Sequence, residues 1–186
     1  VLTAAHVLRW DHAVVHARTR IEGGELGNVD LVKLAGSVAS LEEGPFGEGF
    51  DLFDAALLFN GSALVEVAAA PNLRHGSPQH AMSVLCRFEE PPAVEITLLV
   101  AGASAPLALP RLMAVGGRSA LSDTSAPTPP SMGPFYEGVW RSIRERAPVP
   151  VLAAAARNAV YLAECAQNST RTGRATAAER LLKVVE

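Results

Sequence analysis

Cysteine is scarce in this sequence, which has two cysteines in 186 residues. Cys86 and Cys165 are far apart, so they provide neither a disulfide framework nor a C-x-x-C pair for a metal or a redox role. Blocks of one charge sign are absent too, because 16 basic and 19 acidic residues are interspersed to give a net charge of −3. We therefore expect no nucleic-acid partner, since such proteins carry a basic patch.

Long apolar runs are also missing. The longest uncharged apolar stretch, residues 96–110, is too short to cross a bilayer and contains Gly102, Ser104 and Pro106. We expect no membrane span. The sequence starts at Val1 rather than at a methionine and shows no signal peptide, which predicts a missing N-terminus and leaves the compartment open.

Glycine motifs that bind phosphate groups do not occur. Neither G-x-x-x-x-G-K-[ST] nor G-x-G-x-x-G is found, and the pairs Gly23-Gly24 and Gly116-Gly117 lack the required spacing. We expect no nucleotide, and no other organic cofactor.

Alternating apolar and polar residues predict several short strands. In residues 12–21 this period of two indicates a half-buried strand with one side made of Val15, Ala17, Thr19 and Ile21. Glycine and proline turns separate the further strand candidates, which are residues 31–34, 37–41, 55–59, 81–88 and 94–100. Residues 122–134 contain four prolines and are expected to form a loop. Short strands with frequent turns are typical of a barrel.

Helical patterns follow residue 150. Residues 151–167 place leucines and alanines on one helical face. A second helix is expected from Thr176, where T-A-A-E forms a capping box with Glu179.

Two segments carry a resemblance to a known family. The first eight residues, V-L-T-A-A-H-V-L, resemble the catalytic-histidine strand of trypsin-like serine peptidases. Val7 stands where secreted animal members have cysteine, which makes the HtrA/Deg-like members the closest in pattern. Asp54 begins D-A-A-L-L, which is similar to the family's D-x-A-L-L segment, and it follows His6 at a suitable spacing. Asp51 is the local competitor and is expected to be an exposed turn carboxylate.

The nucleophile motif is degenerate. No G-x-S-G-G-P occurs, and its best remnant is S-M-G-P, which begins at Ser131. In that register Pro129 has no N–H to give to the oxyanion hole, and removing one such donor typically costs about 10²- to 10³-fold in turnover. Met132 adds bulk where the family has glycine.

The resemblance implies a mainly β fold with two antiparallel β-barrels, the first one incomplete, followed by C-terminal α-helices. Residues 1–150 would form the peptidase domain, with the boundary between barrels near residues 65–78, and residues 151–186 a helical segment. It also implies a serine endopeptidase that acts on polypeptide substrates without a cofactor and whose activity the degenerate nucleophile motif would impair. Ser131 would attack the peptide carbonyl, His6 would take its proton and Asp54 would orient His6.

Three alternatives concern function and chemistry. The chain could be a catalytically inactive peptidase-fold domain that binds peptides or protein partners, or an unrelated α/β domain with a chance T-A-A-H match. His12 and His16 have the spacing of two metal ligands on a helix, but the extended local pattern argues against a metal site. Cys86, in a predicted strand, is expected to be a small buried apolar residue.

Overall fold

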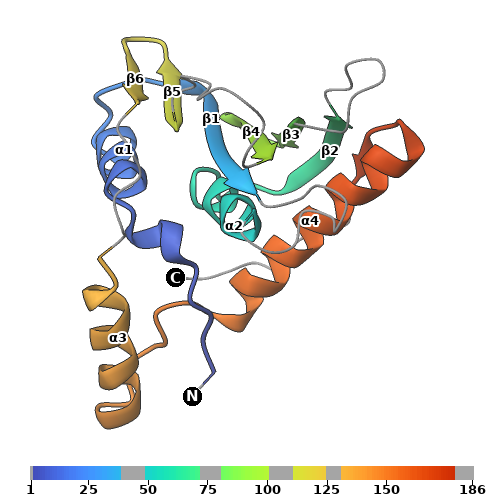
Figure 1. Cartoon of the computed structure of the whole chain (residues 1–186). Coiled ribbons are helices and arrows are strands. Elements are labelled where there is room, and N and C mark those ends of the chain that lie inside the picture. Colours follow the sequence, from blue (N-terminus) through green and yellow to red (C-terminus); the bar gives the residue numbers. More distant parts are fainter. Residues whose placement is uncertain (1, 39–48, 72–80, 101–110, 125–130, 179–186) are drawn as a thin grey trace.

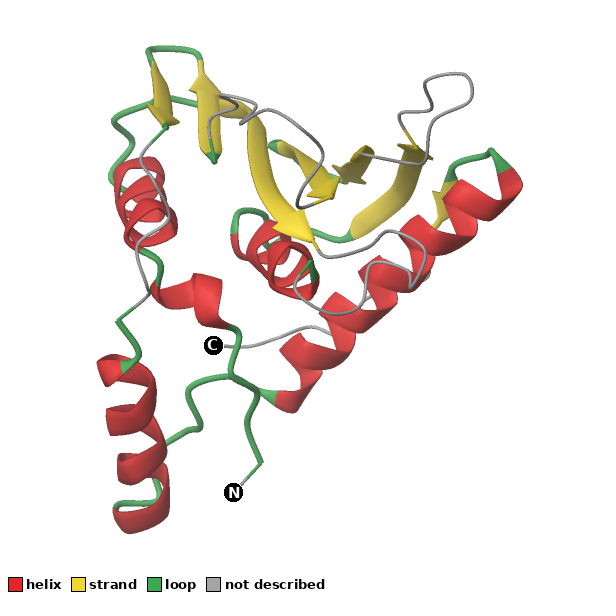
Figure 2. Ribbon diagram, viewed as in Figure 1, coloured by secondary structure: helices red, strands yellow, loops and turns green. Residues whose placement is uncertain are grey.

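The computed structural model describes residues 2–38, 49–71, 81–100, 111–124 and 131–178. They form one open sheet whose helices lie on one side (Figures 1 and 2). In chain order, the elements are η1 (Val7–Trp10), α1 (His12–Glu22), β1 (Val29–Val38), α2 (Phe50–Leu58), β2 (Leu64–Pro71), β3 (Ala81–Phe88), β4 (Ala93–Val100), β5 (Leu112–Gly116), β6 (Ala120–Asp123), α3 (Gly133–Arg144), α4 (Ala153–Thr172) and β7 (Thr176–Ala177).

The described strands make a seven-stranded mixed sheet in the order β6-β5-β1-β4-β3-β2-β7. β1 and β4 run parallel, with Leu34 opposite Ile96, and the other described neighbours run antiparallel. The chain leaves β1 through α2 before it reaches the meander of β2, β3 and β4. In sequence, α2 therefore lies between β1 and this meander. In space, it packs against both β1 and β4.

The core lies between the sheet and the helices. In β3 the inward residues Met82, Val84, Cys86 and Phe88 are all buried, as a period of two requires. α2 is buried over most of its length, and Phe53 is fully buried. Burying a side chain of this kind contributes about 1.5–3 kcal/mol. α2 is thus an interior helix, which explains why its sequence is apolar on nearly every side.

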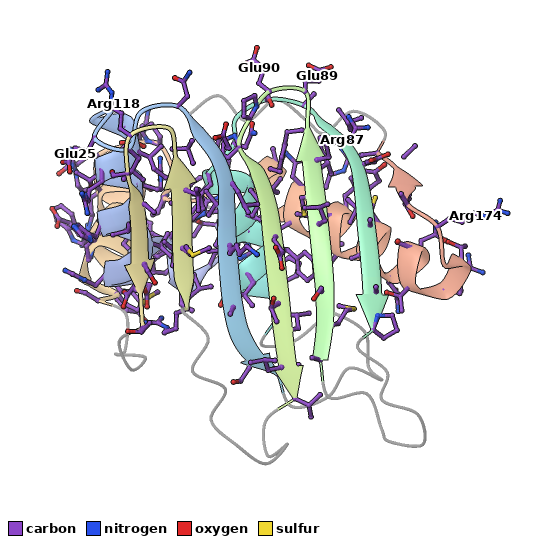
Figure 3. The ribbon with its side chains drawn as sticks, turned by 90° about the horizontal axis from the view of Figure 1, so that it is seen from above. Glu25, Arg87, Glu89, Glu90, Arg118 and Arg174 are labelled. Carbon is purple, nitrogen blue, oxygen red and sulfur yellow. The ribbon has the colours of Figure 1, made fainter. Side chains whose placement is uncertain are left out.

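The other face of the sheet carries no helix among the described residues (Figure 3). Opposite charges stand across neighbouring strands there. Lys33 on β1 pairs with Glu95 on β4 at 2.8 Å, and Arg87 on β3 pairs with Glu66 on β2 at 2.9 Å. Such pairs contribute little to stability, but they keep this face partly polar.

The predicted pair of trypsin-like barrels is wrong, because the described strands form a single open sheet with helices on one side. Residues 12–21 are not a strand but α1, in which Ala13, Val14 and Ala17 are buried. Asp11 caps that helix by accepting a hydrogen bond from the Ala13 N–H at 2.9 Å. The strand expected at residues 55–59 falls mostly in α2. Residues 2–6 form no strand, and Val7 begins η1.

Other predictions about local structure are confirmed. β3 has the expected bounds, β1 and β4 contain residues 31–34 and 94–100, and α4 contains most of residues 151–167. Cys86 is buried.

The helix expected from Thr176 is wrong at its start, because Thr176 and Ala177 pair with β2, and its later residues lie outside the described ranges. The predicted loop at 122–134 overlaps β6 and α3 at its ends, and residues 125–130 are not described. None of the described helices combines the length and apolar character that a membrane crossing needs.

Candidate functional site

His6 ends the extended N-terminal segment and is 3% exposed. Its position is fixed from both sides. The Thr3 hydroxyl donates to the carbonyl oxygen of Val151 at 2.9 Å, which ties the segment to the start of α4, and η1 begins directly after His6. The ring of Phe50 lies 5.2 Å from the imidazole, between ring centroids. The imidazole is thereby held in one place at the N-terminal end of α2.

Two carboxylates of α2 face the imidazole. His6 Nδ1 is hydrogen-bonded to Asp51 Oδ1 at 3.3 Å, and His6 Nε2 lies 3.9 Å from Asp54 Oδ1. Asp51 and Asp54 are three residues apart on a helix, which places both on one face. Nε2 is buried and has no hydrogen-bond partner within the described part of the chain. An unsatisfied buried nitrogen is uncommon and calls for an explanation.

Asp54 is fully buried and held by Arg9. Arg9 Nε donates to Oδ2 at 2.8 Å and Nη2 donates to Oδ1 at 2.9 Å, a two-pronged arrangement that satisfies both carboxylate oxygens. Arg9 comes from η1, three residues after His6. η1 and the residue before it therefore supply both basic side chains that meet the acidic face of α2. We call the four side chains, His6, Arg9, Asp51 and Asp54, the His6 cluster.

The His6 cluster has the chemistry of an acid–base group. With Nδ1–H donating to Asp51, the lone pair of Nε2 is free to accept a proton, and with Nε2 protonated the formal charges of the four side chains sum to zero. The side chain of Asp51 is 25% exposed, which makes it the end of the cluster nearest to solvent. The arrangement can take up and release one proton at Nε2.

The structure brings together two of the three predicted site residues. His6 and Asp54 meet, but Asp54 is bound chiefly by Arg9, and Asp51 makes the shorter contact to the imidazole. Ser131 is exposed just before α3, and it does not bond His6, because Nδ1 is occupied by Asp51 and Nε2 has no partner. No such triad is formed among these three described residues.

Sequence reasoning missed Asp51 and Arg9. Asp51 was expected to be an exposed turn carboxylate, but it lies in the first turn of α2 and bonds His6. The signal that could have found it is the three-residue spacing to Asp54, which brings two carboxylates together only if the segment is helical. Arg9 follows His6 by three residues, a spacing that has the same meaning in a helical turn.

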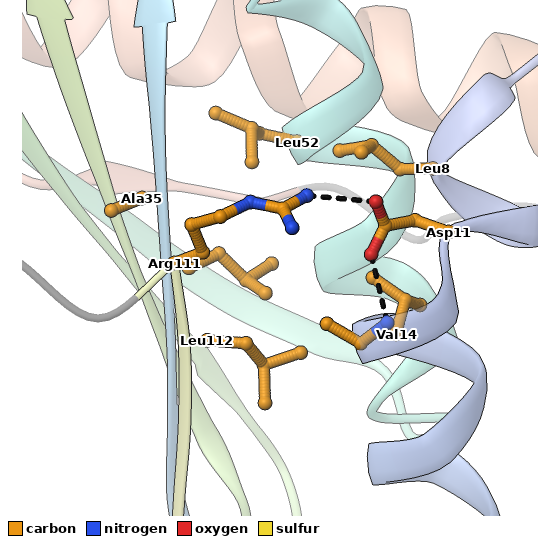
Figure 4. Close-up of a pocket in the computed structure, with 9 residues that line it drawn as sticks. Leu8, Asp11, Val14, Ala35, Leu52, Arg111 and Leu112 are labelled. Carbon is orange, nitrogen blue, oxygen red and sulfur yellow. Dashed lines mark hydrogen bonds and ion pairs between the residues drawn. The ribbon is translucent and has the colours of Figure 1, made fainter. Parts of the chain in front are cut away.

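A second, partly buried ion pair joins Arg111 to the buried carboxylate of Asp11. Arg111 Nη2 donates to Asp11 Oδ2 at 2.7 Å, which joins β5 to the start of α1 (Figure 4). The cavity next to this pair has a volume of about 20 Å³ and is lined mostly by apolar side chains, among them Leu8, Leu34 and Leu52. This is room for one water molecule and not for an organic ligand.

The histidines of α1 stand apart from the cluster. His12 and His16 are exposed, with ring centroids 6.0 Å apart. Within the described ranges, no three His, Cys, Asp or Glu side chains are grouped as a metal site would require. The absence of a metal site stays a prediction.

No family model matches this sequence, and no curated protein matches it. Solved structures do. A protein assigned as an oxidoreductase from Klebsiella pneumoniae superposes with a TM-score of 0.79 at 18% identity, over 96% of this chain and 62% of that one. An NAD-binding protein from Listeria innocua gives 0.73 at 14% identity, over 95% and 66%. A myo-inositol dehydrogenase from Corynebacterium glutamicum gives 0.70 at 15% identity, over 94% and 63%.

These similarities concern the fold, and they show that this chain spans slightly less than two thirds of the length of those proteins. They overturn the resemblance to trypsin-like peptidases, which rested on short segments. A serine endopeptidase is therefore wrong, and so is an inactive peptidase-fold domain; the role of Ser131 as nucleophile has lost its basis. Of the interpretations that the sequence left open, an α/β domain unrelated to peptidases comes closest to a fold shared with oxidoreductases.

Proposed function

We propose that this chain is part of an oxidoreductase that works with a nicotinamide dinucleotide, and that His6 is its acid–base residue. The observation that carries the proposal is the buried imidazole of His6, held by Asp51 at Nδ1 and left without a partner at Nε2. The similarity in fold to a myo-inositol dehydrogenase and to an NAD-binding protein supports the reaction class.

The starts of α1 and α2 and the cavity beside Asp11 do not fit a dinucleotide. Such a site needs a glycine-rich turn between a parallel strand and a helix, so that the pyrophosphate meets free N–H groups. Here carboxylates stand at the starts of two helices, Asp11 as the cap of α1 and Asp51 in the first turn of α2. The cavity beside Asp11 is about 20 Å³, whereas ligand pockets hold roughly 300 Å³ or more. These two helix starts and this cavity therefore supply no dinucleotide site.

What these residues supply is proton transfer. Oxidation of an alcohol requires loss of the hydroxyl proton, and reduction of a carbonyl requires its return. His6 would accept that proton at Nε2 while Asp51 holds the imidazole through Nδ1, which fixes the tautomer. Arg9 donates two hydrogen bonds to Asp54, which hold the second carboxylate in place. The substrate class is a hydroxylated compound.

The test is a turnover assay with the full-length product of the gene. The protein is mixed with NAD⁺ or NADP⁺ and with each of a panel of polyols that includes myo-inositol, and the rate is measured from the absorbance of the reduced nicotinamide. His6→Asn should lower kcat about 10²- to 10⁴-fold, the usual contribution of a positioned general acid or base. His12→Asn is the matched control, because that histidine is exposed on α1. Equal turnover by both variants, or no oxidation with either dinucleotide, would overturn the proposal.

A further inference from the structure

His12 and His16 are exposed on α1 and stand about one helical turn apart. Their side chains share one face of the helix, because residues four apart are neighbours there. The ring centroids are 6.0 Å apart, and the ring planes differ by 22°. The extended local pattern that argues against a metal site does not form, because residues 12–21 lie in α1.

The two imidazoles are close to the separation that one metal ion requires. Bonds of about 2.0–2.1 Å from zinc to nitrogen place the centroids of two imidazoles on one ion about 4.5–5 Å apart. The separation of 6.0 Å exceeds this by about 1 Å. Both side chains are exposed, and exposed side chains change rotamer within nanoseconds, so they can close this gap without a movement of the backbone.

The helix that carries the two imidazoles is held in place. Its inner residues Ala13, Val14 and Ala17 are buried, and the Asp11 carboxylate caps its start. The same carboxylate accepts a hydrogen bond from Arg111 at 2.7 Å, so α1 is also tied to the sheet. Ligands that are already in place bind at a lower entropic cost. Here an ion would need to order only two side chains.

No described side chain competes for the two imidazoles. Neither ring makes a hydrogen bond or an ion pair with another described residue. The two arginines of α1 are also occupied. Arg18 pairs with Glu22 at 3.1 Å, and Arg20 pairs with Glu25 at 2.7 Å. Their positive charges are thereby partly offset, which lowers the repulsion that a cation on this helix would meet.

We propose that His12 and His16 together bind one divalent transition-metal ion, with water in its remaining coordination positions. Imidazole is a preferred ligand of Cu²⁺, Ni²⁺ and Zn²⁺. Structural and catalytic zinc sites use three or four protein ligands, and no such group is found in the part of the chain that the structure describes. Two exposed ligands therefore make an exchangeable site. It departs from the absence of a metal that the sequence predicts, and it goes beyond the proposed function because it shares no residue with the His6 cluster.

Calorimetric titration of the metal-free, full-length gene product with Cu²⁺ tests the proposal. His12→Asn and His16→Asn should each lower the affinity at least about tenfold, since even the residues behind a metal ligand contribute about 10- to 100-fold. A third variant combines His16→Thr with Thr19→His. It keeps two histidines on α1 but sets them seven residues apart, about 10 Å along the axis, so it should bind no better than the single variants.

Equal Cu²⁺ affinity in the native protein and the two single variants overturns the proposal, whether the ion binds elsewhere or does not bind. Native affinity in the third variant overturns it as well, because the spacing of four residues would then be irrelevant.

Thermal unfolding provides an independent readout. The two imidazoles are neighbours only while α1 is helical, so an ion held by both stabilises the folded chain. Saturating Ni²⁺ should raise the unfolding temperature of the native protein and of neither single variant. Mg²⁺ prefers oxygen ligands and should change none of the three. A rise with Ni²⁺ that is as large in His16→Asn as in the native protein overturns the proposal, and so does an equal rise with Mg²⁺.

Discussion

Removing the cation from the buried pair of Arg9 and Asp54 should strongly destabilise the fold. Arg9→Met keeps the approximate volume of the side chain but leaves the Asp54 carboxylate, whose side chain is 1% exposed, without its two donors. Breaking a buried ion pair by removing one partner costs about 3–5 kcal/mol. For a chain of 186 residues this corresponds to a fall of roughly 6–20 °C in the unfolding temperature.

The matched control is Arg141→Met, which removes an exposed pair with Glu145 on α3, where the two side chains are 55% and 49% exposed. That change should cost less than about 1 kcal/mol. Urea unfolding of both variants gives the two free energies with similar slopes. The double variant Arg9→Met with Asp54→Leu should regain most of the loss, because no uncompensated charge remains buried.

A loss for Arg9→Met as small as that for Arg141→Met would refute this reasoning. It would mean that water or another group satisfies Asp54 at little cost. Failure of the double variant to recover would instead show that packing of the Arg9 stem, and not its charge, carries the effect.

Three further outcomes follow from other parts of the sheet. Burial raises the pKa of the Cys86 thiol to about 12, with nearby Cys165 adding to the shift, so alkylation in the native state at about pH 8 should be roughly 10³-fold slower than after unfolding, as measured by mass spectrometry. Arg87 lowers the pKa of Glu66 below 4.5, so Glu66→Gln should slightly reduce the unfolding temperature above about pH 4.5, and the difference should vanish in more acidic solution as the folded-state carboxylate takes up its proton. An equal difference at all pH values would contradict that explanation. Gly116→Ala should cost about 1–3 kcal/mol in urea unfolding, because a Cβ there would collide with the backbone oxygen of Leu26, and a neutral result would show that the turn can shift.

The sequence predicts a strand correctly where its apolar residues fit a period of two and no helical period. β3 alternates cleanly between inward and outward residues, and its bounds were correct. Residues 12–21 satisfy two periods, because Ala13, Val14 and Ala17 also share a helical face. The predicted strand is wrong, because nothing within residues 12–21 decides between the two periods. The cap that does decide, Asp11, lies just outside the window.

The sequence pointed to His6 and Asp54 of the candidate site, but it did so through a resemblance to peptidases that is wrong. Eight residues around His6 suggested a peptidase, and the resemblance selected Asp54, which does lie near His6. Asp51 and Arg9 were overlooked because an extended chain would point them away from these partners. Their roles depend on two helical turns meeting, a tertiary contact that a short motif does not encode.

β1 is the strand whose neighbours are both remote along the chain, because Leu31 lies opposite Ala93 on β4 and Val115 on β5. Short loops connect the strands within the meander of β2, β3 and β4 and within the hairpin of β5 and β6, so these pairs form fast. Both ladders of β1 join residues that are far apart along the chain, and they form more slowly. We expect β1 to enter the sheet after the meander and the hairpin have formed, and to join them. α2, which carries Asp51 and Asp54, packs against both β1 and β4, so its final position depends in part on that strand. Assembly of the His6 cluster would then depend on completion of the sheet.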